Sequence, residues 1–152
     1  MTPTLRNELL RGCVVVAMMA ILSLTAIVPF PIKPNVYLVA LVVLAFVIDD
    51  LLVFLLFLLG VLAWLKYTPF VTMELVALGG MGMGIYTLRK MLIREPHVLL
   101  MVGTLFVFQV IFWALFFGRQ IFVVPFFMEF FYNVLILLVM YSVWVWAKRI
   151  FS

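Results

Sequence analysis

Long apolar runs make up most of this chain, and they constrain its fold more than any other feature. Stretches such as CVVVAMMAILSLTAIV and VLILLVMYSVWVW leave almost no polar face to present to water. Of the 152 residues, 69% are hydrophobic and 11% are charged, and the mean hydropathy is +1.39. A soluble domain of this size needs far more polar surface. The sequence therefore predicts an integral membrane protein with a single polytopic domain over residues 1–152.

The first apolar run predicts an uncleaved membrane span. Arg6 and Arg11 precede it, as basic residues precede the core of a signal peptide. The run nevertheless continues from Cys13 to about Val28, which is long for such a core, and no A-x-A cleavage site follows it. We therefore expect this run to remain as the first span.

Short polar breaks divide the chain into six apolar segments. The breaks are PFPIKPN, DD, KYTP, RKMLIREPH and GRQ, in which Pro, Gly and charged residues interrupt the run. The segments are Leu10–Val28, Val36–Ile48, Leu51–Leu65, Phe70–Leu88, Val98–Phe117 and Val124–Trp146. The pattern predicts about six short helices.

Asp49 and Asp50 allow two interpretations of the stretch from residue 36 to residue 65. The stretch is either one long tilted helix with two carboxylates in its middle, or two short helices joined by a tight turn. Two Asp side chains in mid-membrane would each cost about 2.5–3.5 kcal/mol on insertion scales. This energetic cost favours the turn.

The distribution of cations favours the turn more sharply. With a turn and a cytoplasmic N-terminus, six spans place seven of the ten Lys and Arg residues in the cytoplasm. These seven are Arg6, Arg11, Arg89, Lys90, Arg94, Lys148 and Arg149. One continuous helix leaves only four cations inside and six outside. We therefore predict an all-α bundle of about six short transmembrane helices with both termini cytoplasmic, in which the second and third segments form either a tight pair or a re-entrant pair.

The glycines of ELVALGGMGMGIYTLRK do not form a nucleotide-binding loop. A Walker loop needs a preceding strand, and a Lys and a Ser or Thr after its last glycine, whereas Ile85 and Tyr86 stand in those places. Gly80 and Gly84 share one helix face with Ala77, and small residues on a face allow helices to approach closely in lipid. The pattern predicts helix packing, either inside the bundle or against a helix of a partner protein.

A few polar residues interrupt the later apolar segments and are the candidates for intramembrane chemistry. They are Glu74, Gln109, Glu129 and Asn133. Glu129 and Asn133 are four residues apart and therefore share a helix face. A buried Glu raises the hypothesis of a proton relay or an ion pathway. The structural interpretation, in which Glu129 is solvated near the outer interface or hydrogen-bonded to a neighbour, is favoured.

The cations of the LRKMLIREPH loop, Arg89, Lys90 and Arg94, predict a cytoplasmic anchor for anionic lipid headgroups. No paired carboxylates, metal-binding set or Ser–His–Asp triad can be assembled, and His97 is the one histidine. We therefore expect no enzyme activity, no cofactor and no metal site. Nucleic-acid binding has no support despite the net charge of +4, because the cations are divided among short loops.

The order of features from Pro34 to Leu115 resembles the family of the rod-shape-determining membrane protein MreD. A Pro precedes the apolar run KPNVYLVALVVLAFV, and LFLLGVLAWL follows, with Gly60 at the position of the family's glycine. After a Pro-containing break come TPFVTMELVALGGMGMGIYTLRKMLIREP and the apolar LLMVGTLFVFQVIFWAL. Two departures stand out: KYTP replaces the family's acidic-Ser-Gly turn, and Asp49–Asp50 replaces basic residues of the second loop.

This resemblance implies a non-enzymatic scaffold of the bacterial cell-elongation machinery in the inner membrane. The implied partners are an MreC-like periplasmic protein, the peptidoglycan synthases of elongation and, indirectly, the actin-like filament MreB. The competing hypothesis is the substrate-binding subunit of a vitamin-uptake transporter, which also has six short helices. A transporter needs a cavity with several convergent polar groups, and the few polar residues available favour the scaffold.

Overall fold

The computed structural model describes residues 3–25, 35–65, 72–92, 97–117 and 124–151. Within these residues the chain forms six α-helices and no strand. The helices are α1 (Pro3–Thr25), α2 (Val36–Val47), α3 (Leu51–Leu65), α4 (Met73–Leu92), α5 (Val98–Phe117) and α6 (Val124–Phe151). The prediction of an all-α chain with six helices is confirmed. The first helix begins earlier than predicted and the last ends later, because their charged and polar ends continue the helical backbone.

The turn predicted at Asp49–Asp50 is confirmed. The first of the two helices ends at Val47 and the second begins at Leu51, with Ile48 in an extended conformation at φ −103° and ψ 124°. Asp50 starts the second helix by accepting hydrogen bonds on its Oδ1 from the backbone N–H groups of Leu52 (2.8 Å) and Val53 (3.1 Å). Such N-capping by Asp satisfies backbone donors that a helix start leaves unpaired.

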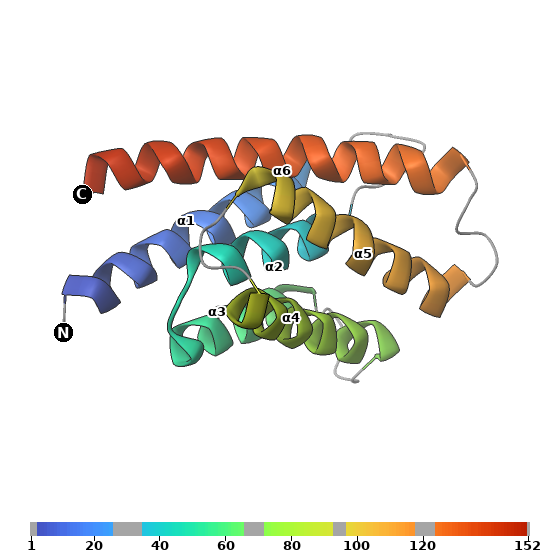
Figure 1. Cartoon of the computed structure of the whole chain (residues 1–152), viewed down its shortest axis with the longest axis horizontal. Helices are drawn as coiled ribbons and strands as arrows, with labels where there is room; N and C mark the ends of the chain where they lie inside the picture. The colour runs from blue at the N-terminus through green and yellow to red at the C-terminus, as the bar shows by residue number, and fades with distance from the viewer. Residues whose placement is uncertain (1–2, 26–34, 66–71, 93–96, 118–123, 152) are drawn as a thin grey trace.

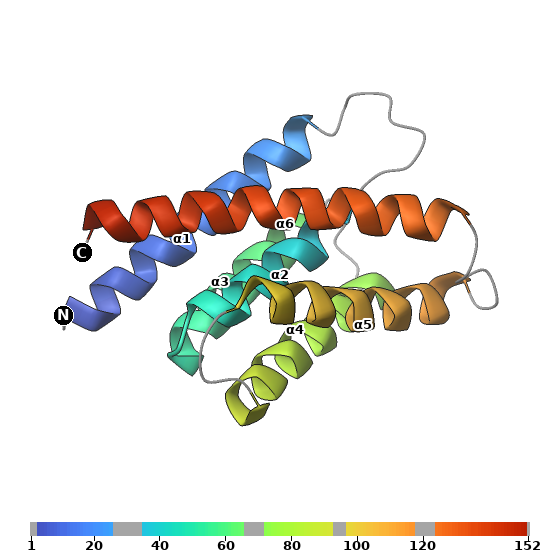
Figure 2. The ribbon, with the colours of Figure 1, turned by 45° about the horizontal axis from the view of Figure 1, so that its top comes forward.

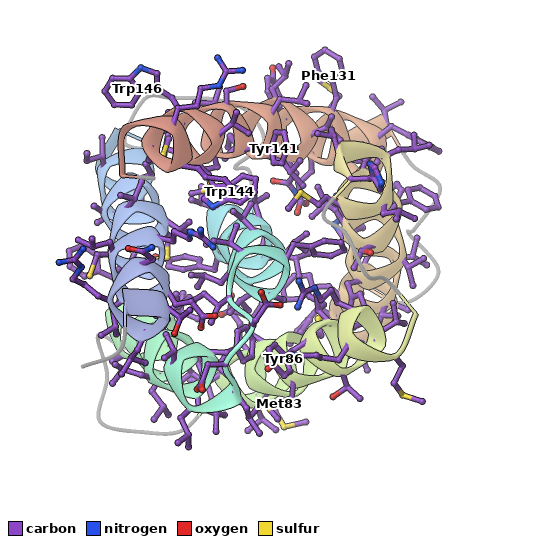
Figure 3. All side chains as sticks on the ribbon, turned by 60° about the vertical axis from the view of Figure 1, so that its left-hand side comes forward. Met83, Tyr86, Phe131, Tyr141, Trp144 and Trp146 are labelled. Carbon is purple, nitrogen blue, oxygen red and sulfur yellow. The ribbon has the colours of Figure 1, made fainter. Side chains whose placement is uncertain are left out.

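Helix α2 lies at the centre of the bundle. It contacts each of the other five helices, which surround it as a ring in Figure 3. Its side chains from Leu38 to Val47 are at most 2% exposed. A helix that is apolar on every face is either surrounded by protein or in contact with lipid, and α2 is surrounded by protein. The side chain of Asn35 caps its start by accepting a hydrogen bond from the Leu38 N–H at 3.0 Å.

The outer surface of the bundle is strongly apolar. Leu52, Met73 and Leu99 are 76%, 79% and 82% exposed, and large apolar side chains are exposed on α1 and on each of α3 to α6. Figure 3 shows Phe131 and Trp146 pointing outward from α6, and Trp144 pointing into the bundle. The described helices thus combine an apolar interior with an exterior that is also apolar.

Two of the described helices, α5 and α6, are long and apolar enough to cross a membrane, over Val98–Phe116 and Val124–Arg149. α2 and α3 are apolar but shorter, at 12 and 15 residues. At about 1.5 Å of rise per residue, α2 is roughly 18 Å long, compared with about 30 Å for the hydrocarbon core of a bilayer. The described residues form six helices, and two of these, α5 and α6, are long and apolar enough to span a membrane.

The start of α1 and the end of α6 lie at the same end of the bundle (Figures 1 and 2). The turn between α2 and α3 belongs to this end too, because the Glu8 side chain of α1 accepts a hydrogen bond from the Asp50 N–H at 3.0 Å. The basic end of α4 joins it through an ion pair between Arg89 and Asp49. Four separate parts of the chain therefore meet at one end.

Candidate functional site

Polar side chains inside the bundle form two groups. The buried polar or charged residues among the described ones are Arg89, Thr104, Gln109, Glu129 and Asn133. Arg89 belongs to a group that we call the turn cluster, which consists of Glu8, Asp49, Asp50, Tyr86 and Arg89. Gln109, Glu129 and Asn133 form a second group together with Trp113, which we call the seam cluster because it lies between α5 and α6. Thr104 instead donates to the carbonyl of Leu100 on its own helix at 2.8 Å.

The turn cluster connects the α2–α3 turn to α4. The Arg89 side chain pairs through Nη1 with Oδ1 of Asp49, and the Tyr86 hydroxyl donates to the backbone carbonyl of Asp49 at 2.7 Å. The Tyr86 ring stacks on Phe54 of α3, with 4.5 Å between the ring centroids. The Arg89 side chain is 7% exposed and that of Asp49 is 58% exposed. The pair therefore reaches from the interior to the surface.

This geometry corrects the interpretation of Arg89 as a headgroup anchor. Its guanidinium is turned into the bundle, because the Asp49 carboxylate at the α2–α3 turn provides a partner for the buried charge. Lys90 is exposed, and its ammonium lies 5.9 Å from the centroid of the Tyr86 ring. Arg94 lies outside the described residues. In the described part of the predicted basic loop, Lys90 is the cation that is exposed and can contact headgroups.

The seam cluster joins α5 to α6 through two hydrogen bonds. The Trp113 indole N–H donates to Oε2 of Glu129 at 2.8 Å, and Nδ2 of Asn133 donates to Oε1 of Gln109 at 3.0 Å. Gln109 and Trp113 are four residues apart on one helix, as Glu129 and Asn133 are on the other, so each pair presents one face to its partner. Gln109 and Asn133 are 0% exposed.

The structure brings together three of the four predicted intramembrane polar residues. Gln109, Glu129 and Asn133 meet at the seam, and the shared face predicted for Glu129 and Asn133 is confirmed. Glu74 is exposed in the first turn of α4 and is not part of this cluster. Trp113 was not predicted as a member. Its position four residues after Gln109 was the available signal, and its indole N–H is the donor that a buried carboxylate needs.

The glycines that pack inside this chain differ from the predicted ones. Gly80 is exposed, and a Cβ atom built on it would meet nothing within 4 Å. A Cβ on Gly84 would make ordinary contact with Phe108 at 3.4 Å, and Ala77 is half-buried. The close approach occurs at Gly82, where a Cβ would lie 2.8 Å from Cδ1 of Leu58.

The packed face of α4 explains this difference. It carries Leu78, Met81, Ile85 and Arg89, and Gly82 lies on it, whereas Gly80 lies on the opposite side of the helix. Figure 3 shows Met83 pointing outward from the same helix. The second glycine at a close approach is Gly12 of α1, where a Cβ would overlap the ring of Phe57. Gly80 therefore does not pack against the rest of the described chain.

Two surface depressions lie near these groups. One has a volume of about 200 Å³ and is lined by Thr4, Leu5, Glu8 and Asp50, beside the turn cluster. The other has a volume of about 480 Å³ and is lined by residues of α4 alone, including Met83, Thr87 and Met91, so it is a shallow face of one helix. The seam cluster borders neither of them.

Comparisons with known proteins give no relative: the chain matches no protein-family model, no curated protein and no solved structure. The resemblance to the MreD family therefore rests on the sequence features quoted above. Over the described residues, the class of protein that the fold itself defines is an all-helical bundle with a central apolar helix and two polar clusters, one buried between α5 and α6 and one that reaches the surface.

Proposed function

We propose that this chain is a polytopic protein of the bacterial inner membrane, with all six helices in the bilayer region. The supporting observation is the apolar exterior. A soluble protein rarely exposes large contiguous apolar patches, whereas here exposed Leu, Val, Met and Phe cover α3 to α6. The core helix of a soluble protein is mostly buried, but only 39% and 28% of the apolar windows in α5 and α6 are buried. Lipid is the solvent that suits such a surface.

The end of the bundle that carries the turn cluster faces the cytoplasm in this proposal. Arg6 and Arg11 lie near the start of α1, and Lys148 and Arg149 near the end of α6, at the same end as Arg89. Cations gather on the cytoplasmic side of membrane proteins. Both termini are then cytoplasmic, as the sequence predicts.

We further propose that the protein is a non-enzymatic scaffold of the cell-elongation machinery. The single observation that carries this proposal is that the internal polar groups are engaged with one another across helices. Asp49 pairs with Arg89, Glu129 with Trp113, and Gln109 with Asn133. Groups used in this way hold a bundle together, as expected of a protein that acts through its outer helix faces. The partial MreD-like pattern supplies the biological setting and the MreC-like partner.

A vitamin-uptake subunit is the second candidate, and one observation favours it. Two buried polar atoms of the seam cluster, Nε2 of Gln109 and Oδ1 of Asn133, have no hydrogen-bond partner within the described residues. An unpaired donor beside an unpaired acceptor is a feature of sites that hold a polar ligand. The seam would then have to open, because both residues are fully buried.

Depletion in a rod-shaped bacterial host distinguishes the two functions. The scaffold proposal expects cells to round up, and affinity capture through this protein to recover the MreC-like periplasmic partner. The transport proposal expects normal cell shape and tight binding of a vitamin to the purified protein. Normal shape together with vitamin binding would replace the scaffold with the transporter.

A further inference from the structure

Among the described residues the seam cluster has one acceptor without a donor, Oδ1 of Asn133, and one donor without an acceptor, Nε2 of Gln109. The Asn133 amide uses Nδ2 to donate to Gln109, which leaves its buried Oδ1 without a donor among the described residues. Glu129 lies four residues earlier on α6, so its side chain is on the same helix face as that of Asn133. Oε2 of Glu129 already accepts the Trp113 indole N–H. A carboxyl group can supply the missing donor only in its protonated form, because an ionised carboxylate accepts and never donates.

The distribution of charged groups around Glu129 also favours its protonated form. The helices packed against α6 are α1, α2 and α5. α5 has no charged residue from Val98 to Phe117, and the one titratable side chain of α2 is the Tyr37 phenol. The charged residues of α1 are Arg6, Glu8 and Arg11, at the opposite end of the bundle, and Cys13 follows them. α6 itself adds the Tyr132 phenol beside the cluster.

None of these groups is a cation positioned to balance a carboxylate at the seam. Burial of a charge is strongly unfavourable unless it is paired, and the described seam offers Glu129 neutral hydrogen-bond partners only. The neutral carboxylic acid needs no counter-ion, and it also satisfies Asn133.

We propose that Glu129 is held as a neutral carboxylic acid that donates its O–H to Oδ1 of Asn133, which makes the α5–α6 seam a proton-sensitive joint. The resulting chain of hydrogen bonds runs from Trp113 through Glu129 and Asn133 to Gln109 and crosses the seam twice. When Glu129 loses its proton, a carboxylate oxygen faces the amide oxygen of Asn133. Repulsion between these oxygens, and the water that the charge attracts, then loosen α5 from α6.

Infrared spectroscopy of the full chain in lipid nanodiscs tests this proposal. The wild type should show, at neutral pH, the C=O band of a protonated carboxyl that shifts in D₂O. Glu129→Gln should lose this band, because an amide replaces the acid. The matched control Glu74→Gln changes an exposed carboxylate of similar chemistry and should keep the band. Asn133→Ser should move the band to higher frequency, since the hydroxyl of the shorter Ser side chain is a weaker acceptor than the amide oxygen.

Thermal unfolding against pH is the second readout. Glu129→Gln keeps a donor and an acceptor in the same place and cannot ionise, so its unfolding midpoint should stay flat while that of the wild type falls in alkaline solution. A carboxylate spectrum for Glu129 at neutral pH, with the Asn133 amide rotated to donate to it, would overturn the proposal. Identical pH dependence of wild type and Glu129→Gln would overturn it as well. If Glu129→Gln does not fold, the wild-type band and its response to Asn133→Ser decide.

Discussion

Arg89 of α4 pairs with Asp49, 40 residues earlier in the turn between α2 and α3. This ion pair fixes the C-terminal end of the central helix, because the turn is also bonded to Tyr86 through its backbone carbonyl and to Glu8 through the Asp50 N–H. The doublet Asp49–Asp50 thus has two separate roles. Asp50 starts α3, and Asp49 receives a buried cation.

Asp49→Asn should destabilise the bundle although Asp49 itself is largely exposed. The buried Arg89 guanidinium would keep its charge and lose its ionic partner. We expect the free energy of unfolding to fall by roughly 1.5–3 kcal/mol, the range for a hydrogen bond to a charged group. Chemical denaturation in detergent micelles measures the change, with Glu74→Gln as the control at an exposed carboxylate. Equal stability of Asp49→Asn and wild type would show that the ion pair is not important.

The glycines of α4 should respond differently to the same substitution. Gly80→Ala should be neutral or stabilising by up to about 1 kcal/mol, because its Cβ meets open space and Ala is the better helix former. Gly82→Ala should be less stable than Gly80→Ala, because Cδ1 of Leu58 lies 2.8 Å from its Cβ and would have to move. Thermal unfolding of both variants in one detergent provides the comparison. The reverse order of stability would contradict the observed orientation of α4.

Because Gly80 lies on the outside of the bundle, a substitution there can test assembly with a partner without disturbing the fold. Gly80→Leu should leave the isolated protein folded, since nothing in the described chain contacts this position. If a partner helix packs on Gly80 and Gly84, the same variant should reduce capture of the MreC-like partner. Unfolding of the isolated Gly80→Leu protein would instead indicate contacts inside the bundle.

The hydrogen bond between Gln109 and Asn133 should couple α5 and α6 energetically. A double-mutant cycle with Gln109→Leu and Asn133→Leu should give a coupling free energy of about 0.5–2 kcal/mol, as measured for hydrogen bonds between membrane helices. A matched cycle pairs Gln109→Leu with Ser142→Ala, since the Ser142 hydroxyl donates to the carbonyl of Leu138 on its own helix. The control cycle should be additive. Additivity in both cycles would show that the seam hydrogen bond carries no stability.

Membrane topology follows from the ends that the structure brings together. Reporter fusions at residue 93 and at the C-terminus should both be cytoplasmic, and a fusion at residue 119 should be external. This arrangement follows from the six crossings that we propose and from the cations near the start of α1 and the end of α6. An external signal at residue 93 would contradict the six-crossing topology.

The helices and the Asp49–Asp50 turn could be predicted because their signals are local. A break in an apolar run and an N-capping Asp are determined by neighbouring residues. The central position of α2 could not be predicted, although its apolar composition was evident. α3 is equally apolar, yet Leu52, Leu56 and Leu59 of that helix are exposed while α2 is covered. Composition does not distinguish a helix surrounded by protein from one surrounded by lipid.

The inward faces of the helices were harder to predict for the same reason. In a water-soluble protein the polar face of a helix identifies the exposed side. In α4 both faces are apolar, so no pattern in the sequence distinguishes Gly82 from Gly80 as the packed glycine. The inward orientation of the Arg89 side chain also depends on Asp49, which comes close to it only when α2, α3 and α4 are assembled. The seam cluster was partly predictable because polar residues are rare in these helices.

Cell shape after depletion tests the proposed scaffold function most directly. When this protein is depleted from a rod-shaped bacterial host, the cells should round up, and expression of wild type or of Glu129→Gln should restore the rod. Rescue by Glu129→Gln is expected because the variant keeps the hydrogen bonds of the seam and the outer helix faces. Cells that keep their rod shape on depletion would contradict the scaffold function, and rounding that only the wild type reverses would show that the ionisable group of Glu129 is itself required.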